Sequence, residues 1–170
     1  MKISLDIELE KAVRILAKYL LPSKENSRKP ILMHDLRVGM HLYENNYSHD
    51  IILAGVLHDA LEFSEITEQM ISEEFGENVL RLVKANSKDR SIENSDERIE
   101  ELIKRCAQTG EDALIVKVAD TLDSFKYYTK TNNQSELEYC RKTTGAIFKY
   151  KSEDYKDPIF EKLEEWINKL

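Results

Sequence analysis

Residues that interrupt helices are rare in this sequence, which contains only 5 glycines and 3 prolines in 170 residues. Between them, apolar residues recur at helical spacing, as Leu36, Met40 and Tyr43 do at i, i+4 and i+7. An amphipathic sequence with few glycines and prolines favours long helices over hairpins. We therefore predict an all-α fold. The hydrophobic content of 41% is enough for the core of one domain over residues 1–170.

Capping residues mark where the expected helices begin and end. The first begins at an N-cap Asp6, turns Ile7 inward and ends before Pro22. The third begins at Ser48 and continues without a break through Leu61. The segment 86–94 is charged and is expected to be irregular. The other helices are expected after Pro30, from Thr67 to Gly76, after Asn78, from an N-cap Ser95 to Gly110, from Ala113 to Phe125 and after Pro158.

The composition excludes several classes of function. The chain has 32 acidic and 25 basic residues, a formal charge of −7, so its field repels polyanions and we expect no nucleic acid polymer as a partner. The longest apolar runs are much shorter than the roughly 18 residues of a membrane span, and because the first residues lack the features of a signal peptide we expect none. We expect a cytoplasmic protein whose Cys106 and Cys140 are packed thiols. Its oligomeric state stays open.

The adjacent pair His58-Asp59 is the most informative chemical feature. It ends an apolar helical pattern, where polar residues are otherwise sparse. A buried carboxylate without a partner is destabilising, and a divalent cation removes that penalty by binding both the carboxylate and the neutral imidazole. The alternative is an ordinary packed pair, with His58 in a local hydrogen bond and Asp59 beside a basic residue. For an isolated dipeptide this alternative is favoured, so other residues must decide.

Three further residues favour a metal site. His34 lies one helix-turn-helix upstream and Asp120 ends another apolar run, so both could reach His58-Asp59. Glu62 lies at i+4 from His58, where a carboxylate could direct a water molecule. Two imidazoles and two carboxylates suit Mn²⁺, Fe²⁺, Co²⁺, Ni²⁺ or Zn²⁺ better than Ca²⁺. Such a cation lowers the pKa of a bound water and neutralises a phosphoryl oxygen, which predicts a metal-dependent phosphohydrolase.

Four segments match, in order and with plausible spacing, the motifs of a known family. They read HDLRVG at 34–39, LHDALE at 57–62, FGENVLRLV at 75–83 and IVKVAD at 115–120. Together they resemble the HD phosphohydrolase superfamily, and most closely its RelA/SpoT-like branch of guanosine tetraphosphate hydrolases. The similarity runs from about Arg28 to Phe125. It implies an HD-domain multi-helix bundle.

The resemblance also implies a site and an activity. His34, His58, Asp59 and Asp120 would hold one divalent metal ion, commonly Mn²⁺ in this branch. Glu62 matches the acid that orients or deprotonates the attacking water. The expected substrate is a small phosphorylated nucleotide, and the nearest family activity is guanosine-3′,5′-bis(diphosphate) 3′-pyrophosphohydrolysis.

Basic residues near the motifs are candidates for phosphate binding. Arg28 and Lys29 resemble a basic pair that faces the substrate's phosphates in the family, with plain surface charge as the alternative. Arg37 and Lys117 could neutralise phosphate or bridge an acid on a neighbouring helix. His41 shares the helical face of the first motif's histidine but lies outside the motif. Tyrosines that could stack on a nucleobase, with core packing as the favoured alternative, are Tyr127, Tyr128, Tyr139 and Tyr150.

The chain departs from the family pattern in two places. Phe63 stands where the hydrolase branch usually has a second acid, and residues 121–124 read TLDS where the family tends to have Arg-Leu-His-Asn. These departures predict weakened pyrophosphate hydrolysis. They leave open an HD-type nucleoside 5′-monophosphatase, which uses one such acid, and an HD nucleotide-binding or regulatory module. A third alternative is a helical interaction protein without a metal, in which His34 and His58 are core histidines.

Overall fold

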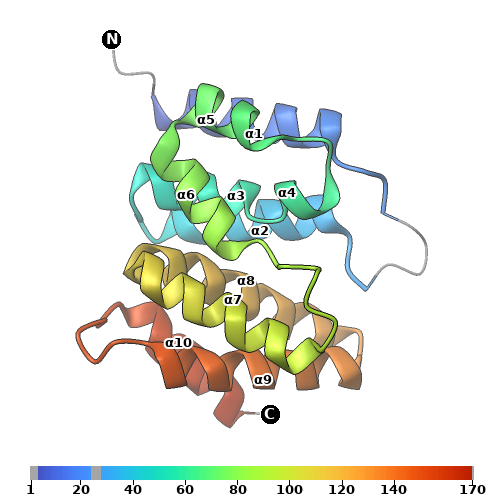
Figure 1. The fold of residues 1–170 in the computed structure, drawn as a ribbon, viewed down its shortest axis with the longest axis vertical. Helices are drawn as coiled ribbons and strands as arrows, with labels where there is room; N and C mark the ends of the chain where they lie inside the picture. The colour runs from blue at the N-terminus through green and yellow to red at the C-terminus, as the bar shows by residue number, and fades with distance from the viewer. Residues whose placement is uncertain (1–3, 24–27, 170) are drawn as a thin grey trace.

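The computed structural model describes residues 4–23 and 28–169, and residues 1–3, 24–27 and 170 of the predicted domain lie outside this part. The described residues form helices joined by short loops and contain no strand, which confirms the all-α prediction (Figure 1). An isolated antiparallel bridge joins Leu20 to Ser64. The helices are α1 (Leu5–Tyr19), α2 (Ile31–Glu44), α3 (His49–Leu57), α4 (Ala60–Phe63), α5 (Glu68–Phe75), α6 (Glu77–Asn86), α7 (Ser95–Thr109), α8 (Glu111–Lys130), α9 (Gln134–Tyr150) and α10 (Pro158–Asn168).

The helices are stacked from one end of the molecule to the other (Figure 1). Helices α1 and α5 lie at one end, α9 and α10 lie at the other, and α2, α3, α6, α7 and α8 fill the middle. The core is centred on α3 and α8, because residues 51–57 of α3 and 113–119 of α8 are all buried. Both helices contact α2. The three elements that carry the first, second and last family motifs therefore meet in the centre of the fold.

Two glycines let α2 and α3 approach each other closely. A Cβ atom on Gly39 would lie 2.2 Å from Cγ2 of Val56, and one on Gly55 would lie 2.4 Å from Cδ1 of Leu42. Both contacts are too short for a larger residue unless a neighbour shifts, which the flexible end of Leu42 can do more readily than the β-branched Val56. The close crossing brings the start of α2, with His34, to the end of α3.

The predicted continuous helix through Leu61 is wrong. Helix α3 ends at Leu57, His58 and Asp59 form a turn, and α4 starts at Ala60. Successive side chains of an unbroken helix point about 100° apart. The turn instead lets the side chains of His58 and Asp59 face the same space.

Two residues expected on the core face are exposed. Ile7 is 61% and Met40 is 42% accessible to solvent. Helix α1 packs through Ala12 and Leu16, and α2 buries the stripe that contains Val38, so Met40 lies on the opposite face of its helix. In each of these two helices, the spacing of the apolar residues allows either of two faces to be the buried one. The packing against the other helices determines which face is buried.

Most predicted helix ends are confirmed, with small shifts. Thr67 caps α5 by accepting a hydrogen bond from the Met70 amide. Gly76 and Gly110 end α5 and α7 at positive φ angles of 93° and 132°. The predicted caps at Asp6 and Ser95 are wrong, because α1 already starts at Leu5 and α7 is capped by the side chain of Asn94.

Helix α9 was not among the predicted elements. Its buried face mixes apolar residues with Cys140, Thr143 and Thr144, so the apolar period is weak in the sequence. The helix packs on α7 and α8, and several of its residues line one side of a cavity of about 600 Å³.

Cys106 and Cys140 are buried free thiols, as predicted. Among the described residues, none of the helices combines the length and apolar character that crossing a membrane requires.

Candidate metal centre

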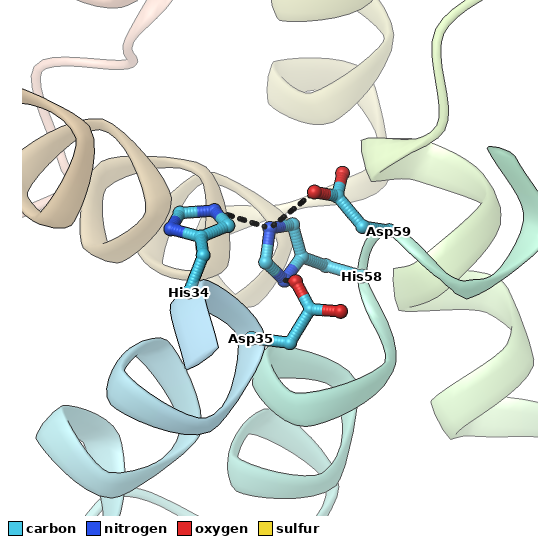
Figure 2. A group of neighbouring side chains, drawn as sticks. All are labelled: His34, Asp35, His58 and Asp59. Atoms are coloured by element: carbon cyan, nitrogen blue, oxygen red, sulfur yellow. Dashed lines mark hydrogen bonds and ion pairs between the residues drawn. The ribbon is translucent and has the colours of Figure 1, made fainter. Parts of the chain in front are cut away.

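Two histidine rings face each other where the start of α2 meets the end of α3. The Nε2 atoms of His34 and His58 are 3.2 Å apart, and both side chains are inaccessible to solvent. Figure 2 shows the two rings with Asp59 and Asp35 around them. The sequence positions of the two histidines differ by 24 residues. The close α2–α3 crossing is what brings them together.

Two carboxylates complete this group. Asp120 Oδ1 lies 3.0 Å from His34 Nε2 and 3.8 Å from His58 Nε2. Asp59 Oδ2 lies 3.7 Å from His58 Nε2 (Figure 2). Ligand atoms bound at about 2.1 Å to one ion are separated by about 3 Å when adjacent and about 4 Å when opposite. His34, His58 and Asp59 belong to one group of ligand atoms within 4.8 Å of one another, and Asp120, which is not in that group, lies beside both imidazoles.

The hydrogen bonds made by the two Nδ1 atoms leave the Nε2 lone pairs of both rings available to a positively charged group. His58 Nδ1 donates to the carbonyl oxygen of Gly55 at 2.8 Å, and His34 Nδ1 donates to Asp123 Oδ2 at 2.7 Å. With Nδ1 protonated on each ring, the lone pairs on the two Nε2 atoms face each other. Two lone pairs at this distance repel unless a positive charge lies between them. The donor set thus fits a cation.

The protonation states of the group also suit a metal. Burial lowers the pKa of His58, which keeps the imidazole neutral. Burial alone would raise the pKa of Asp120, but the charges of Lys117 and Lys29 outweigh it and hold that pKa well below its usual range. The pKa of Asp59 is also lowered, because nearby positive charge outweighs its burial. Neutral imidazoles and ionised carboxylates are the forms that bind metal ions.

Asp35 is a further member of this group, and its sequence position alone did not mark it as one. His34, Asp35, His58 and Asp59 each offer one ligand atom, and these atoms lie within 4.8 Å of one another. Neither oxygen of Asp35 has a hydrogen-bond partner among the described residues, although the side chain is fully buried. Burial raises its pKa well above the usual range. An unpartnered buried carboxyl beside two lone pairs is a second feature that favours a cation here.

The two predicted phosphate-binding residues behave differently. Lys29 Nζ lies 2.7 Å from His34 Nε2 and 3.4 Å from Asp120 Oδ1, and it donates to Ser124 Oγ at 2.9 Å. Its ammonium group therefore contacts the same atoms that a metal ion would use. Arg28 instead forms an ion pair with Glu136 of α9 at 3.1 Å.

Glu62 lies on α4, directly after the His58-Asp59 turn. Its side chain is 3% exposed and accepts hydrogen bonds from the Lys88 amide at 2.9 Å and from Arg90 Nη2 at 3.3 Å. The guanidinium group of Arg90 stacks over the ring of Phe63, 5.0 Å from its centroid. Phe63, which occupies the position of the missing second acid, thus supports a positive charge next to Glu62.

A cavity of about 600 Å³ opens beside the group of histidines and acids. Asp59, Asp120 and Glu62 line it together with Tyr128 and Tyr139. Basic side chains are in excess along its wall, although the chain as a whole carries a charge of −7. Four acids, Asp59, Glu62, Asp120 and Glu136, also line the wall, and an excess of one sign of charge favours ligands of the opposite sign. The basic residues of the wall are Arg28, Lys29, Lys88, Arg90, Arg98 and Lys117.

Three of these basic residues, Lys88, Arg90 and Arg98, were not predicted as site residues. The only sequence signal of Lys88 and Arg90 is a charged segment between two helices, and that of Arg98 is a charged helix face, both of which are more often plain solvated surface. Arg37 of α2 binds Asp123 of α8, which is the predicted alternative of a bridge to an acid on a neighbouring helix, whereas Lys117 bridges Asp120 of its own helix at 2.8 Å. The histidines and acids within 4.8 Å of one another do not include His41.

Comparison with known proteins identifies the family. The family model described as "HD domain" matches residues 12–149, so the chain belongs to the HD domain family. Membership implies a divalent metal ion, and the buried His/Asp group is where one could bind.

Curated relatives and a solved structure narrow the comparison. The chain is 32% identical over 121 residues to the guanosine-3′,5′-bis(diphosphate) 3′-pyrophosphohydrolase of Aquifex aeolicus (strain VF5), covering 70% of this chain and 17% of that protein. It is 29% identical over 160 residues to the probable enzyme of the same name from Mycoplasma pneumoniae, covering 84% and 22%. The chain thus spans about a fifth of the length of these relatives.

The fold is shared with a solved structure described as a metazoan ortholog of SpoT that hydrolyses ppGpp. The TM-score is 0.74 at 19% identity, and the match covers 99% of this chain and 97% of that one. At this identity the match establishes the helical fold alone. It agrees with the family assignment from the sequence.

Proposed function

We propose that this protein is a metal-dependent phosphohydrolase of small phosphorylated nucleotides, acting as a guanosine-3′,5′-bis(diphosphate) 3′-pyrophosphohydrolase. The observation that carries the proposal is the buried group of two imidazoles and neighbouring carboxyl groups at the wall of a cavity with an excess of basic residues. The names of the bacterial relatives support the substrate. Action in the cytoplasm is part of the same proposal.

The proposed metal ligands are His34, His58, Asp59 and Asp120, and the proposed ion is Mn²⁺. A mixed nitrogen and oxygen donor set suits Mn²⁺ among the first-row divalent ions. When bound, such an ion supplies positive charge to a phosphoryl oxygen and makes a water molecule more acidic. Asp35 adds a nearby buried carboxyl without a hydrogen-bond partner, which would lose its proton when a cation binds beside it.

The chain's own residues would bind the substrate and direct the reaction. Lys88, Arg90 and Arg98 line the cavity and would neutralise the phosphate groups. Glu62 would accept one proton from the water that attacks the phosphorus. The bond between phosphorus and the 3′ oxygen then breaks, and the 3′ oxygen takes up a proton to give a hydroxyl group and pyrophosphate. Arg90 and the Lys88 amide hold the Glu62 carboxylate in place for this role.

Phe63 supports a second candidate, a nucleoside 5′-monophosphatase. The single acid Glu62 after the His-Asp pair resembles the pattern of that activity, and in this structure Arg90 stacks over Phe63 where a second acid would stand. The two candidates differ in the product they release. One gives pyrophosphate and the other gives orthophosphate.

Turnover of a nucleotide panel tests the proposal. Protein treated with a chelator and reloaded with Mn²⁺ is expected to release pyrophosphate from guanosine 3′,5′-bis(diphosphate), as measured by ion-exchange chromatography. We expect Glu62→Gln to reduce the rate by about 10²- to 10⁴-fold without loss of Mn²⁺ binding. Orthophosphate from nucleoside 5′-monophosphates alone would support the monophosphatase. Nucleotide binding without any Mn²⁺-dependent product would indicate a regulatory module and overturn the enzyme.

A further inference from the structure

His34 presents its two ring nitrogens to two carboxylates of α8. Nε2 lies 3.0 Å from Asp120 Oδ1, and Nδ1 donates to Asp123 Oδ2 at 2.7 Å. Asp120 and Asp123 are three residues apart on α8, as His34 and Arg37 are on α2, so each pair lies on one helical face. We propose that Asp123, held by Arg37, is a positioning residue that sets the tautomer and orientation of His34 for metal binding. The inference rests on the proposed function, because it takes His34 to be a metal ligand.

Arg37 holds Asp123 through two parallel hydrogen bonds. Its Nε donates to Oδ1 at 2.7 Å, and its Nη2 donates to Oδ2 at 2.9 Å. A carboxylate in such a bidentate pair is fixed in both direction and charge. The oxygen that Arg37 Nη2 binds also accepts the Nδ1 proton of His34. The ring is therefore locked with its proton on Nδ1 and its lone pair on Nε2, the atom that faces the other proposed ligands.

The second histidine of the site is fixed in a different way. His58 Nδ1 donates to the carbonyl oxygen of Gly55, three residues earlier in its own chain segment. The backbone of α3 thus sets the tautomer of His58, whereas a side chain from another helix sets that of His34. A substitution at Asp123 should consequently disturb His34 and leave His58 unchanged.

Asp123 belongs to one of the two departures from the family pattern. It stands at the position where the resemblance predicts a histidine. A carboxylate accepts the Nδ1 proton of His34 in a charge-assisted hydrogen bond, which is stronger than a bond between neutral rings. In this chain, His34 is therefore held by a carboxylate where the family tends to have a histidine, and Arg37 in turn binds that carboxylate.

Metal titration tests the positioning role. We expect Asp123→Ala to weaken Mn²⁺ binding by about 10- to 100-fold in isothermal calorimetry of the chelator-treated full chain. Asp123→Asn keeps an acceptor oxygen and should have a smaller effect, as should Arg37→Gln. The double variant Asp123→Ala with Arg37→Gln should bind no more weakly than Asp123→Ala alone, because Arg37 acts through Asp123. Asp112→Asn, on the same helix α8, is the control and should leave the affinity unchanged.

The tautomer of His34 gives a second readout that a general loss of stability does not produce. In ¹⁵N NMR of the metal-free protein, His34 should carry its proton on Nδ1, and Asp123→Ala should move it toward Nε2 while His58 keeps its signal. Circular dichroism checks that each variant is folded, and Asp123→Asn serves if the alanine variant is not. Unchanged Mn²⁺ affinity and tautomer in the folded variants overturn this inference alone. A wild-type protein that binds no Mn²⁺ overturns both the proposed function and the inference.

Discussion

Lys29 places a positive charge on the atoms that a metal ion would use. Its ammonium group contacts His34 Nε2 and Asp120 Oδ1 and is anchored by Ser124. This contact relieves the repulsion between the lone pairs and balances the charge of the carboxylates. An incoming metal ion must displace it, after which Lys29 is free to turn toward the cavity that it lines. Lys29 therefore stabilises the metal-free protein and opposes metal binding.

Replacing this charge should therefore have two opposite effects. We expect Lys29→Met to lower the melting temperature of the metal-free protein and to tighten Mn²⁺ binding by about tenfold, which corresponds to about 1.4 kcal/mol. The loss of the ammonium leaves Asp120 less compensated, so a cation gains more by binding there. Calorimetry with Mn²⁺ and thermal unfolding measure the two effects. Lys104→Met, an exposed substitution on α7, is the control, and weaker Mn²⁺ binding by Lys29→Met would contradict the competition.

The sequence predicts some of these residues and not others for a physical reason. His58, Asp59 and Asp120 stand out because they are polar residues within or at the end of apolar runs. The contacts of Lys29 and Asp123 depend on how α2 packs against α8, across about 90 residues of sequence. No local pattern encodes that register, so their parts in the site emerge only from the structure.

At the scale of the elements, the α2–α3 crossing determines whether the histidines meet. We expect Gly39→Ala to lower the free energy of unfolding by about 1–3 kcal/mol, because its Cβ would overlap Val56 and the helices must separate. The same displacement should weaken Mn²⁺ binding, since each helix carries one histidine. Urea unfolding measures the stability change. Gly145→Ala on α9 meets no atom within 4 Å and should instead raise stability by up to about 1 kcal/mol.

Helix α9 and the break after α3 mark the limit of prediction at this scale. Helical periodicity identifies α7 and α10, where the apolar stripe is continuous, but it is weak in α9, where threonines and a cysteine occupy the buried face. Neither residue of the break at His58-Asp59 is a glycine or a proline, so the sequence does not predict it. At the break the His58 ring donates to the carbonyl oxygen of Gly55, a side-chain contact that apolar periodicity does not reveal.

At the scale of the whole molecule, the buried thiols report on opening of the fold. Cys106 lies on α7 and Cys140 on α9, and burial raises their pKa values to about 11 and about 12. We expect both to resist alkylation in the native protein and to react at the rate of unfolding. Because the folded pKa lies above the unfolded value of about 8.5, the contribution of the two thiols to stability should be constant below that pH and fall as the pH rises toward 11. Alkylation followed by mass spectrometry and urea unfolding at pH 7–11 check this, and fast native labelling would contradict it.

A metal ion would also join parts of the molecule that are far apart in the sequence. The proposed ligands come from α2, from the turn after α3 and from α8, which stack through the middle of the fold (Figure 1). Because the unfolded chain does not hold these side chains together, binding adds directly to the free energy of unfolding. At a free Mn²⁺ concentration one hundred times its dissociation constant, the gain is about 2.7 kcal/mol.

For a domain of this size, that gain should raise the melting temperature by about 5–10 °C, and a chelator should reverse it. Differential scanning calorimetry with and without Mn²⁺ measures the shift. Asp59→Ala should abolish it, whereas Asp154→Ala, an exposed acid in the loop before α10, should preserve it. Equal shifts in the wild-type protein and in Asp59→Ala would place the ion elsewhere, because a site that depends on three converging segments cannot keep its affinity after losing one of its charged ligands.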